Sequence, residues 1–305
     1  MHASGEGARS TPAVSSADRS GHDIDPSMVE VEVDRIGASA DRARRDQLAA
    51  EEPLEIRLGF GPAKARHRQS LTVTMRTPGA DVELAVGFLF AEGIVRQRTD
   101  IESAENCGPR VGPRLLRNVV RVELTPTVRV DSKQLTRSFL TTSACGLCGK
   151  QSLKALARVE QPPMADGYAV PAAIVHALPD ALRRAQTVFD RTGGLHAAAL
   201  FDQEGRLLDV REDVGRHNAL DKLIGARVLA GAVPLAEHLI LVSGRAGYEL
   251  VQKAVAAGVP ILAAVGAPSS LAAELARDAN MTLLGFVRAG RFNIYSGAAR
   301  IRLAA

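Results

Sequence analysis

The pattern of hydrophobic and polar positions predicts an α+β unit in the first half of the chain. Residues 69–75 alternate between apolar and polar side chains as a strand does, and residues 118–124 form a second strand. Between them, residues 77–94 begin with turn residues and continue as a very apolar helix. Gly93 is placed to end that helix.

The last third of the chain shows a regular alternation of strands and helices. Residues 196–213 predict two strands joined by a turn at Glu204–Gly205. Strands that alternate with helices at short spacing then indicate parallel βαβ units. The expected elements are a helix at 216–231, a strand at 239–244, a helix at 247–258, a strand at 260–266, a helix at 269–280 and a strand at 281–288.

These elements divide the chain into four parts and predict the α/β class. Residues 1–27 contain almost no apolar side chains, so we expect a disordered tail. Residues 28–139 form an N-terminal α+β domain, and residues 164–305 form a C-terminal α/β domain. Between them, residues 140–163 hold a mobile loop with the motif Cys145-x-x-Cys148, a helix at 149–159 and a Pro-Pro hinge.

Composition narrows the class of protein. The chain has 305 residues, of which 46% are hydrophobic and 24% charged, so it can form a large core. Three cysteines do not make a disulfide framework, and we find no signal peptide or membrane segment. We therefore expect a cytoplasmic protein with reduced thiols. With no Trp and only 4% aromatics, nucleic-acid binding is poorly supported.

Three glycine-containing loops follow the last three predicted strands. They lie at 243–247, 266–270 and 286–291, and in an open parallel sheet ligands bind at the carboxyl ends of strands. Two of the loops lead into helix N-termini, which attract anions. Either these residues are simply turn formers with surface arginines, or they bind an anionic, nucleotide-like ligand, which three such loops favour. No P-loop or G-x-G-x-x-G motif is present.

A cluster of ionisable residues lies at 211–217, between a predicted strand and helix. It contains Glu212, Asp213, Arg216 and His217. One interpretation is helix capping by Asp213 within a solvated charge cluster. The other is a polar ligand site, shared with His196. No general-base role follows from His217 alone.

The pair Cys145 and Cys148 allows several kinds of chemistry. Structural zinc needs about four ligands, and neither a second C-x-x-C nor an H-x-x-x-H motif exists. A thioredoxin-like redox pair and an inert pair of turn cysteines also remain open. We favour a sulfur-carrying thiol, because the following helix N-terminus and nearby lysines should favour the reactive thiolate. Cys107 is interpreted as a bystander.

Six segments together resemble one known family. They are SACGLCGK, TGGLHAAAL, REDVGRHNALDKLIG, SGRAGYELVQKA, APSSLAAELA and TLLGFVRAGRFNIYS, and TPGADVELAVGFLFAEGI matches the family's N-terminal part. The chain resembles the formate dehydrogenase accessory sulfurtransferases, the FdhD family, from about residue 50 to residue 300. Such long stretches in the right order are far more specific than a bare C-x-x-C motif.

The resemblance implies a sulfur carrier. Sulfur would come from a cysteine desulfurase as a persulfide and pass to the molybdenum bis-guanine-dinucleotide cofactor, as formate dehydrogenase requires. It implies that Cys145 carries the persulfide and Cys148 is the second thiol. It also implies a homodimer and a C-terminal domain like cytidine deaminases in fold. The implied cofactor-binding residues, where a guanine nucleotide also binds, are Phe286, Val287, Arg288, Ala289, Gly290 and Arg291, followed by Gly244, Arg245, Ser269 and His217.

Deaminase chemistry is not expected from such a fold. It requires an H-x-E segment and a P-C-x-x-C segment around one zinc ion. His196 is followed by Ala-Ala, His217 by Asn-Ala, and Cys145 is preceded by Ala144. We therefore expect no catalytic zinc. Two other hypotheses remain, a non-catalytic cofactor-binding chaperone and a structural module held together by zinc.

Overall fold

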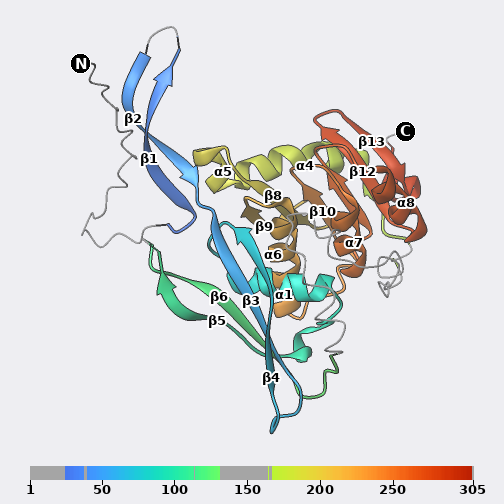
Figure 1. Cartoon of the computed structure of the whole chain (residues 1–305). Coiled ribbons are helices and arrows are strands. Elements are labelled where there is room, and N and C mark those ends of the chain that lie inside the picture. The colour runs from blue at the N-terminus through green and yellow to red at the C-terminus, as the bar shows by residue number, and fades with distance from the viewer. Residues whose placement is uncertain (1–24, 38–39, 113, 131–163, 165–166, 304–305) are drawn as a thin grey trace, which may run out of the picture.

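The structure, a computed structural model, describes residues 25–37, 40–112, 114–130, 164 and 167–303. In these residues the chain forms a four-stranded and a six-stranded sheet, with helices packed between and around them. A two-stranded ribbon and a short strand pair complete the fold (Figure 1). The predicted α/β class is confirmed.

The four-stranded sheet has the strand order β4-β3-β6-β5. The predicted strands at 69–75 and 118–124 are confirmed as two of its members, but the other two were not predicted. One of these, at the sheet edge, has Ile101 as its only buried residue, so its sequence shows no hydrophobic period. The strands are β3 Glu52–Phe60, β4 His67–Arg76, β5 Ile101–Val111 and β6 Leu116–Leu124.

A ribbon of β1 (Met28–Ile36) and β2 (Ala40–Ala49) extends away from the body, as Figure 1 shows in blue. It is the part of the predicted N-terminal domain that the sequence pattern did not reveal. Residues 1–24 of the predicted tail lie outside the described residues. Ser27, by contrast, is buried, and its hydroxyl donates a 2.6 Å hydrogen bond to the Asp25 carboxylate, so the last residues of that segment form an ordered turn.

The six-stranded sheet has the order β13-β12-β11-β10-β8-β9. Its three central strands are parallel, as predicted. The sheet as a whole is mixed, however, because antiparallel strands flank the parallel core on both sides. The edge strand at Arg291–Ser296 was not predicted. The strands are β8 His196–Phe201, β9 Leu207–Asp213, β10 Leu239–Val242, β11 Ile261–Ala264, β12 Thr282–Arg288 and β13 Arg291–Ser296.

Alternate side chains of the six-stranded sheet enter two separate hydrophobic cores. Leu239 and Leu241 face a core shared with α4 (Ala172–Ala185), whereas Ile240 and Val242 face the core shared with the helices of the other side. This is the period of two expected for a strand that is buried on both faces. The arrangement makes a three-layer α/β unit. The helices of the second side are α6 Arg216–Leu229, α7 Tyr248–Ala256 and α8 Ser270–Asp278.

The first helix, α1 (Asp81–Ala91), lies between the two sheets and crosses α6 with almost no space between the backbones. A Cβ atom on Gly87 would lie 1.9 Å from the Asp221 carbonyl oxygen, and one on Gly225 would lie 1.9 Å from that of Glu83. The two glycines therefore permit the contact. One hydrophobic core continues through this crossing from the four-stranded sheet to α7.

The predicted ends of the helices are confirmed where the chain is described. Gly93, Gly231 and Gly258 follow α1, α6 and α7 with positive φ, which glycine adopts without strain. The sequence pattern predicted no element at residues 172–192, by contrast, and the structure has α4 and α5 there. The remaining elements are α5 Thr187–Thr192, the short strands β7 Val170–Pro171 and β14 Ile301–Arg302, and the 3₁₀ turns Arg98–Asp100 and Ala298–Arg300.

Several predictions concern the segment around the cysteine motif. Cys145, Cys148, the helix at 149–159 and the hinge at Pro162–Pro163 all lie outside the described residues. In the part of the chain that is described, no helix is both long and apolar enough to cross a membrane.

Candidate functional site

The three predicted strand-end loops come together at one edge of the six-stranded sheet. The Gly266 N–H donates to the Gly244 carbonyl at 2.9 Å, and the Phe286 N–H donates to the Gly266 carbonyl at 3.0 Å. A third bond, 3.1 Å long, joins the Ser269 N–H to the Ala246 carbonyl. The backbone thus connects the β10–α7 loop, the β11–α8 loop and the β12–β13 hairpin into one surface.

Two glycines allow this close approach. A Cβ on Gly266 would lie 3.0 Å from Cα of Arg245, and one on Gly285 would lie 2.8 Å from Cδ of Pro268. Such distances are shorter than ordinary carbon contacts, so larger residues would push the loops apart. Arg245 itself is exposed at this edge, as a ligand-facing residue requires.

The segment predicted as a third loop has a different structure. Phe286, Val287 and Arg288 belong to β12, and Arg291 begins β13, with only Ala289–Gly290 as the turn between them. The pairing of the two strands is irregular here. Phe286 has φ of 53°, a left-handed conformation that costs a bulky residue free energy and often occurs at functional sites.

The hairpin forms one wall of an open pocket with a volume of about 250 Å³. Phe286, Arg288, Arg291 and Asn293 line the pocket. The Arg288 guanidinium donates to the Val265 carbonyl at 2.7 Å, so it fastens the hairpin to the end of β11. Asn293 was not among the predicted site residues. It could have been found only from the strand alternation that puts positions 291 and 293 on one face.

Helix N-termini surround the same edge. α7 begins at Gly247 and α6 at Gly215, and neither residue supplies a side-chain cap. Ser269 caps α8, because its hydroxyl accepts the Ala272 N–H at 3.3 Å. Ser269 therefore already has a structural role, whereas the uncapped N–H groups of α6 and α7 attract negative charge.

The charged cluster at 211–217 is only partly available to a ligand. The Glu212 carboxylate accepts the backbone N–H groups of Val188 and Phe189 at 3.0 and 2.9 Å, at the start of α5. Asp213 is fully buried, so the interpretation of a solvated charge cluster is wrong for it. Its Oδ1 accepts the Gly215 N–H at 2.8 Å, just before α6.

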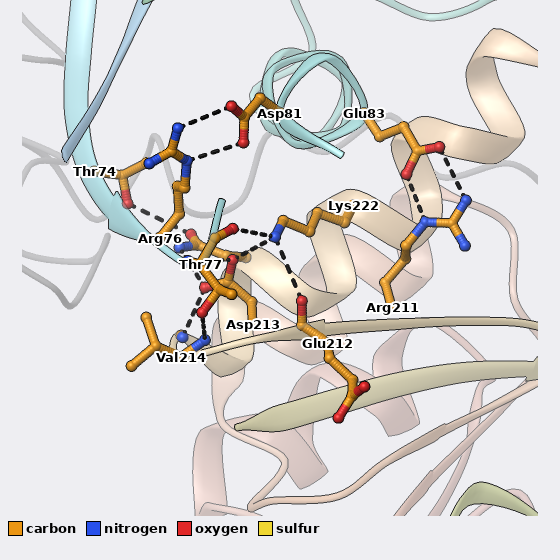
Figure 2. Close-up of polar contacts among 12 residues, drawn as sticks. Thr74, Arg76, Thr77, Asp81, Glu83, Arg211, Glu212, Asp213, Val214 and Lys222 are labelled. Atoms are coloured by element: carbon orange, nitrogen blue, oxygen red, sulfur yellow. Dashed lines mark hydrogen bonds and ion pairs between the residues drawn. The ribbon is translucent and has the colours of Figure 1, made fainter. Parts of the chain in front are cut away.

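Asp213 also connects the two halves of the fold, as Figure 2 shows. Its Oδ2 accepts the Thr77 N–H at 3.1 Å and forms an ion pair with Lys222 Nζ at 2.7 Å. Lys222 in turn donates to the Thr77 carbonyl at 2.8 Å. We call these residues, with Gly215 and Asn218, the Asp213 network. It holds the β9–α6 junction against the segment before α1.

Two more ion pairs lie beside this contact, and one of them, Arg211–Glu83, joins the two halves. The Arg76 guanidinium binds the Asp81 carboxylate through two hydrogen bonds of 2.9 and 2.8 Å, at the start of α1. Arg211 binds Glu83 in the same way, at 2.5 and 2.9 Å (Figure 2). Paired arginine–carboxylate contacts fix both distance and orientation. The position of the β9–α6 junction is therefore set by α1.

His217 lies in the first turn of α6, and its Nε2 is 3.2 Å from Glu249 Oε2 in the first turn of α7. Burial, together with the positive charges of Arg216 and Lys253, lowers the pKa of His217 to about 3. The ring is therefore neutral at pH 7. Burial also lowers the pKa of His196. Its Nδ1 would lie 3.2 Å from a Cβ atom placed on Gly244, so His196 is next to the β10–α7 loop. The two histidines thus lie near the joined loops.

The lowered pKa of His217 predicts a pH-dependent stability. The unfolded histidine binds a proton near pH 6.5 but the folded one only near pH 3, so stability falls as the pH drops through this range. We expect urea unfolding to show that the wild type loses about 2 kcal/mol more than His217→Gln between pH 7 and pH 5. Parallel curves for the two proteins would contradict this.

Metal ligands and thiols give no further detail of the site. In the residues that the structure describes, no group of three or more His, Cys, Asp and Glu side chains could hold a metal ion. Cys107, on β5, is a free and half-buried thiol. The roles of Cys145 and Cys148 remain predictions from the sequence.

Comparisons with known proteins give a consistent result. A model of the FdhD/NarQ family matches residues 49–302. The sulfur carrier protein FdhD of Streptomyces coelicolor is 50% identical over 274 residues, which cover 89% of this chain and 94% of that protein. The protein of the same name from Mycobacterium tuberculosis is 50% identical over 270 residues, covering 86% and 95%.

A solved structure supports the fold. It is a crystal structure from Desulfotalea psychrophila assigned as a formate dehydrogenase accessory protein. The two align with a TM-score of 0.68 and 23% identity, over 91% of this chain and all of the other. At this identity the likeness concerns the fold alone. The family model and the relatives that are half identical over most of their length confirm the resemblance noted in the sequence, and this chain belongs to the FdhD/NarQ family.

Proposed function

We propose that this chain is a sulfur carrier that accepts sulfur from a cysteine desulfurase as a persulfide on Cys145. It then passes the sulfur to the molybdenum bis-guanine-dinucleotide cofactor, as formate dehydrogenase requires. The name shared by the half-identical relatives supports the sulfur-carrying role. The donor, the acceptor, the homodimer and the cytoplasmic location are parts of the proposal that come from the family resemblance.

The main support for binding of the sulfur acceptor is the surface that the three loops form together. It combines an exposed aromatic ring, the guanidinium of Arg291, and two uncapped helix N-termini at one edge of the sheet. A ring suits a nucleobase, whereas cations and free N–H groups suit phosphates. The donor set therefore fits the nucleotide part of the proposed acceptor, which is the substrate of the transfer.

The chemistry of the cysteine pair balances without an outside oxidant. A Cys145 thiolate attacks the outer sulfur of the desulfurase persulfide, an S–S bond forms as another breaks, and the desulfurase thiolate leaves. If the Cys148 thiolate then attacks Cys145 Sγ, the outer sulfur leaves as HS⁻ and a Cys145–Cys148 disulfide forms. A reducing thiol must open that disulfide before the next cycle.

Peptide mass spectrometry tests the carrier step. The purified protein is incubated with a cysteine desulfurase and cysteine, and a second sample lacks the desulfurase. We expect the peptide that holds Cys145 and Cys148 to gain the mass of one sulfur atom, and a reducing thiol to remove it. Cys145→Ala should show no gain, whereas Cys107→Ala should behave as the wild type.

The alternative is a non-catalytic chaperone that only binds the cofactor. In that case the peptide gains no sulfur although both thiols are free and metal-free, and both Cys→Ala variants still support formate dehydrogenase activation. An Arg291→Ala variant would then fail to support it. Under the sulfur-carrier proposal, Cys145→Ala abolishes activation while the protein still folds and binds a guanine nucleotide. Metal analysis addresses a zinc-stabilised module, which should contain one zinc per chain.

A further inference from the structure

A second pocket lies between the β5–β6 hairpin and the segment that leads into α1, well away from β12 and β13 (Figure 1). Its volume is about 260 Å³, and the proposed sulfur transfer makes no use of it. Arg110, Arg117 and the amide of Asn106 line it, and Leu115 and Leu116 form an apolar wall beside them. The pocket therefore combines positive charge with apolar surface.

The two arginines of this pocket, which we call the arginine pair, lie directly opposite each other. Arg110 on β5 is the register partner of Arg117 on β6. Like charges in this position destabilise a sheet, so the fold itself gains nothing from having both. Among the described residues, Arg110 donates to the Leu115 carbonyl at 3.3 Å and Arg117 donates to the Gly108 carbonyl. Because each guanidinium has five N–H donors, most of them remain for a ligand.

The carboxylates of this region are bound to other arginines. Asp81 also lines the pocket, but both of its oxygens accept hydrogen bonds from Arg76, at 2.9 and 2.8 Å (Figure 2). The Glu52 carboxylate forms an ion pair with Arg114 of the hairpin turn, at 3.2 Å. In the part of the chain that the structure describes, no carboxylate binds either member of the arginine pair. The pair therefore keeps an uncompensated positive charge.

Leu115 gives the apolar wall an unusual form. Its side chain is 58% exposed, and its φ of 51° is a left-handed value that costs a bulky residue free energy. Backbone strain of this kind often occurs at binding sites. An exposed apolar side chain beside two guanidiniums suits a ligand that carries a carboxylate and an apolar group close together.

We propose that this pocket binds an acidic segment of a partner protein. A glutamate or aspartate carboxylate would meet the arginine pair, and a neighbouring apolar side chain would pack on Leu115. Guanidinium groups bind carboxylates through two parallel hydrogen bonds, so they fix orientation as well as charge. A free inorganic anion would use the arginine pair but not the apolar wall, so the wall favours a peptide. The proposal does not depend on the sulfur chemistry of the cysteine motif.

The test measures binding of a capped synthetic peptide of alternating glutamate and leucine to the full chain, by calorimetry. We expect the dissociation constant to rise at least about 10-fold when glutamine replaces glutamate in the peptide. Raising the salt concentration from roughly 0.05 to 0.5 M should also weaken binding, because salt screens exposed charges. Inorganic phosphate should displace the peptide only in large excess, because it cannot use the apolar wall.

Variants of the chain locate the binding site. Arg110→Ala/Arg117→Ala should weaken the peptide by about 10- to 100-fold, because charge-assisted hydrogen bonds are lost. Its melting temperature should match that of the wild type, since the pair repels itself in the free protein. Arg277→Ala/Arg302→Ala removes two exposed arginines elsewhere, gives the same net charge and should bind as the wild type does. Leu115→Gly suits the left-handed backbone and should weaken this peptide, but not one with alanine in place of leucine.

Four results would overturn the proposal. In the first, the wild type does not bind the glutamate–leucine peptide. In the second, the two double variants weaken it equally, because net charge alone then drives binding. In the third, inorganic phosphate displaces the peptide at equal concentration, because the pocket is then a site for a free anion. In the fourth, Arg110→Ala/Arg117→Ala melts well below the wild type, which would give the pair a structural role. None of these results affects the sulfur-carrier step.

Discussion

Replacing Lys222 by Met is expected to destabilise the protein by about 3–5 kcal/mol, because it leaves the Asp213 carboxylate buried without its cation. The two side chains are 2% and 0% exposed, and their charged atoms lie 2.7 Å apart. Methionine fills a similar volume but cannot donate to Asp213 or to the Thr77 carbonyl. Urea unfolding at pH 7 measures the loss.

Two control variants distinguish the effect of an unpaired buried charge from the general effect of removing a lysine. Lys64→Met removes an exposed lysine and should change stability by less than about 0.5 kcal/mol. The double variant Asp213→Asn/Lys222→Met removes both charges and should recover most of the loss, because the unpaired anion is gone. If the double variant is as unstable as Lys222→Met, the destabilisation comes from packing and not from charge.

The crossing of α1 and α6 is expected to give the second large effect. In an open helix, Gly→Ala stabilises by about 1 kcal/mol. At Gly225 the new Cβ would lie 1.9 Å from the Glu83 carbonyl oxygen and 2.7 Å from the Gly87 nitrogen. These backbone atoms cannot move away without separating the helices. The steric clash should therefore outweigh the gain in helix propensity, and the substitution should lower stability. We expect Gly225→Ala to destabilise the protein by roughly 3 kcal/mol.

A glycine away from the crossing provides the comparison. The atom nearest to a Cβ on Gly194 would be the Ala49 Cβ at 3.4 Å, an ordinary contact, so Gly194→Ala should change stability by less than about 1 kcal/mol. Gly87→Ala should behave as Gly225→Ala does, because its Cβ would lie 1.9 Å from the Asp221 carbonyl oxygen. Equal melting temperatures for Gly225→Ala and the wild type would show that the helices do not cross as described.

The sequence predicted the central strands because they are short, continuous apolar runs. β10 and β11 are buried on every residue, a pattern that a parallel strand covered on both faces produces. β13 was missed because three of its six residues are exposed and Arg291 and Asn293 interrupt the apolar pattern. An edge strand with a solvated face has no strong period to detect.

The part of the site that follows from the parallel direction of neighbouring strands could be predicted from the sequence. Loops after neighbouring parallel strands must meet at one edge, so the joined loops followed from the alternation of elements. The partners of Asp213 did not, because Thr77 lies 136 residues away in the sequence. The sequence also treats Arg288 and Arg291 alike, and only the structure shows that the Arg288 side chain donates to the Val265 and Val287 carbonyls.

The packing of α1 has a consequence for the synthesis of the protein. About 125 residues separate the end of α1 at Ala91 from the start of α6 at Arg216. At ribosomal speeds of about 5–20 residues per second, α1 leaves the ribosome roughly 6–25 s before its partner helix exists. The face of α1 that packs against α6 lacks its partner for that time, although the four-stranded sheet on its other side is complete at Leu124. The nascent chain therefore offers chaperones a binding segment that the folded protein conceals.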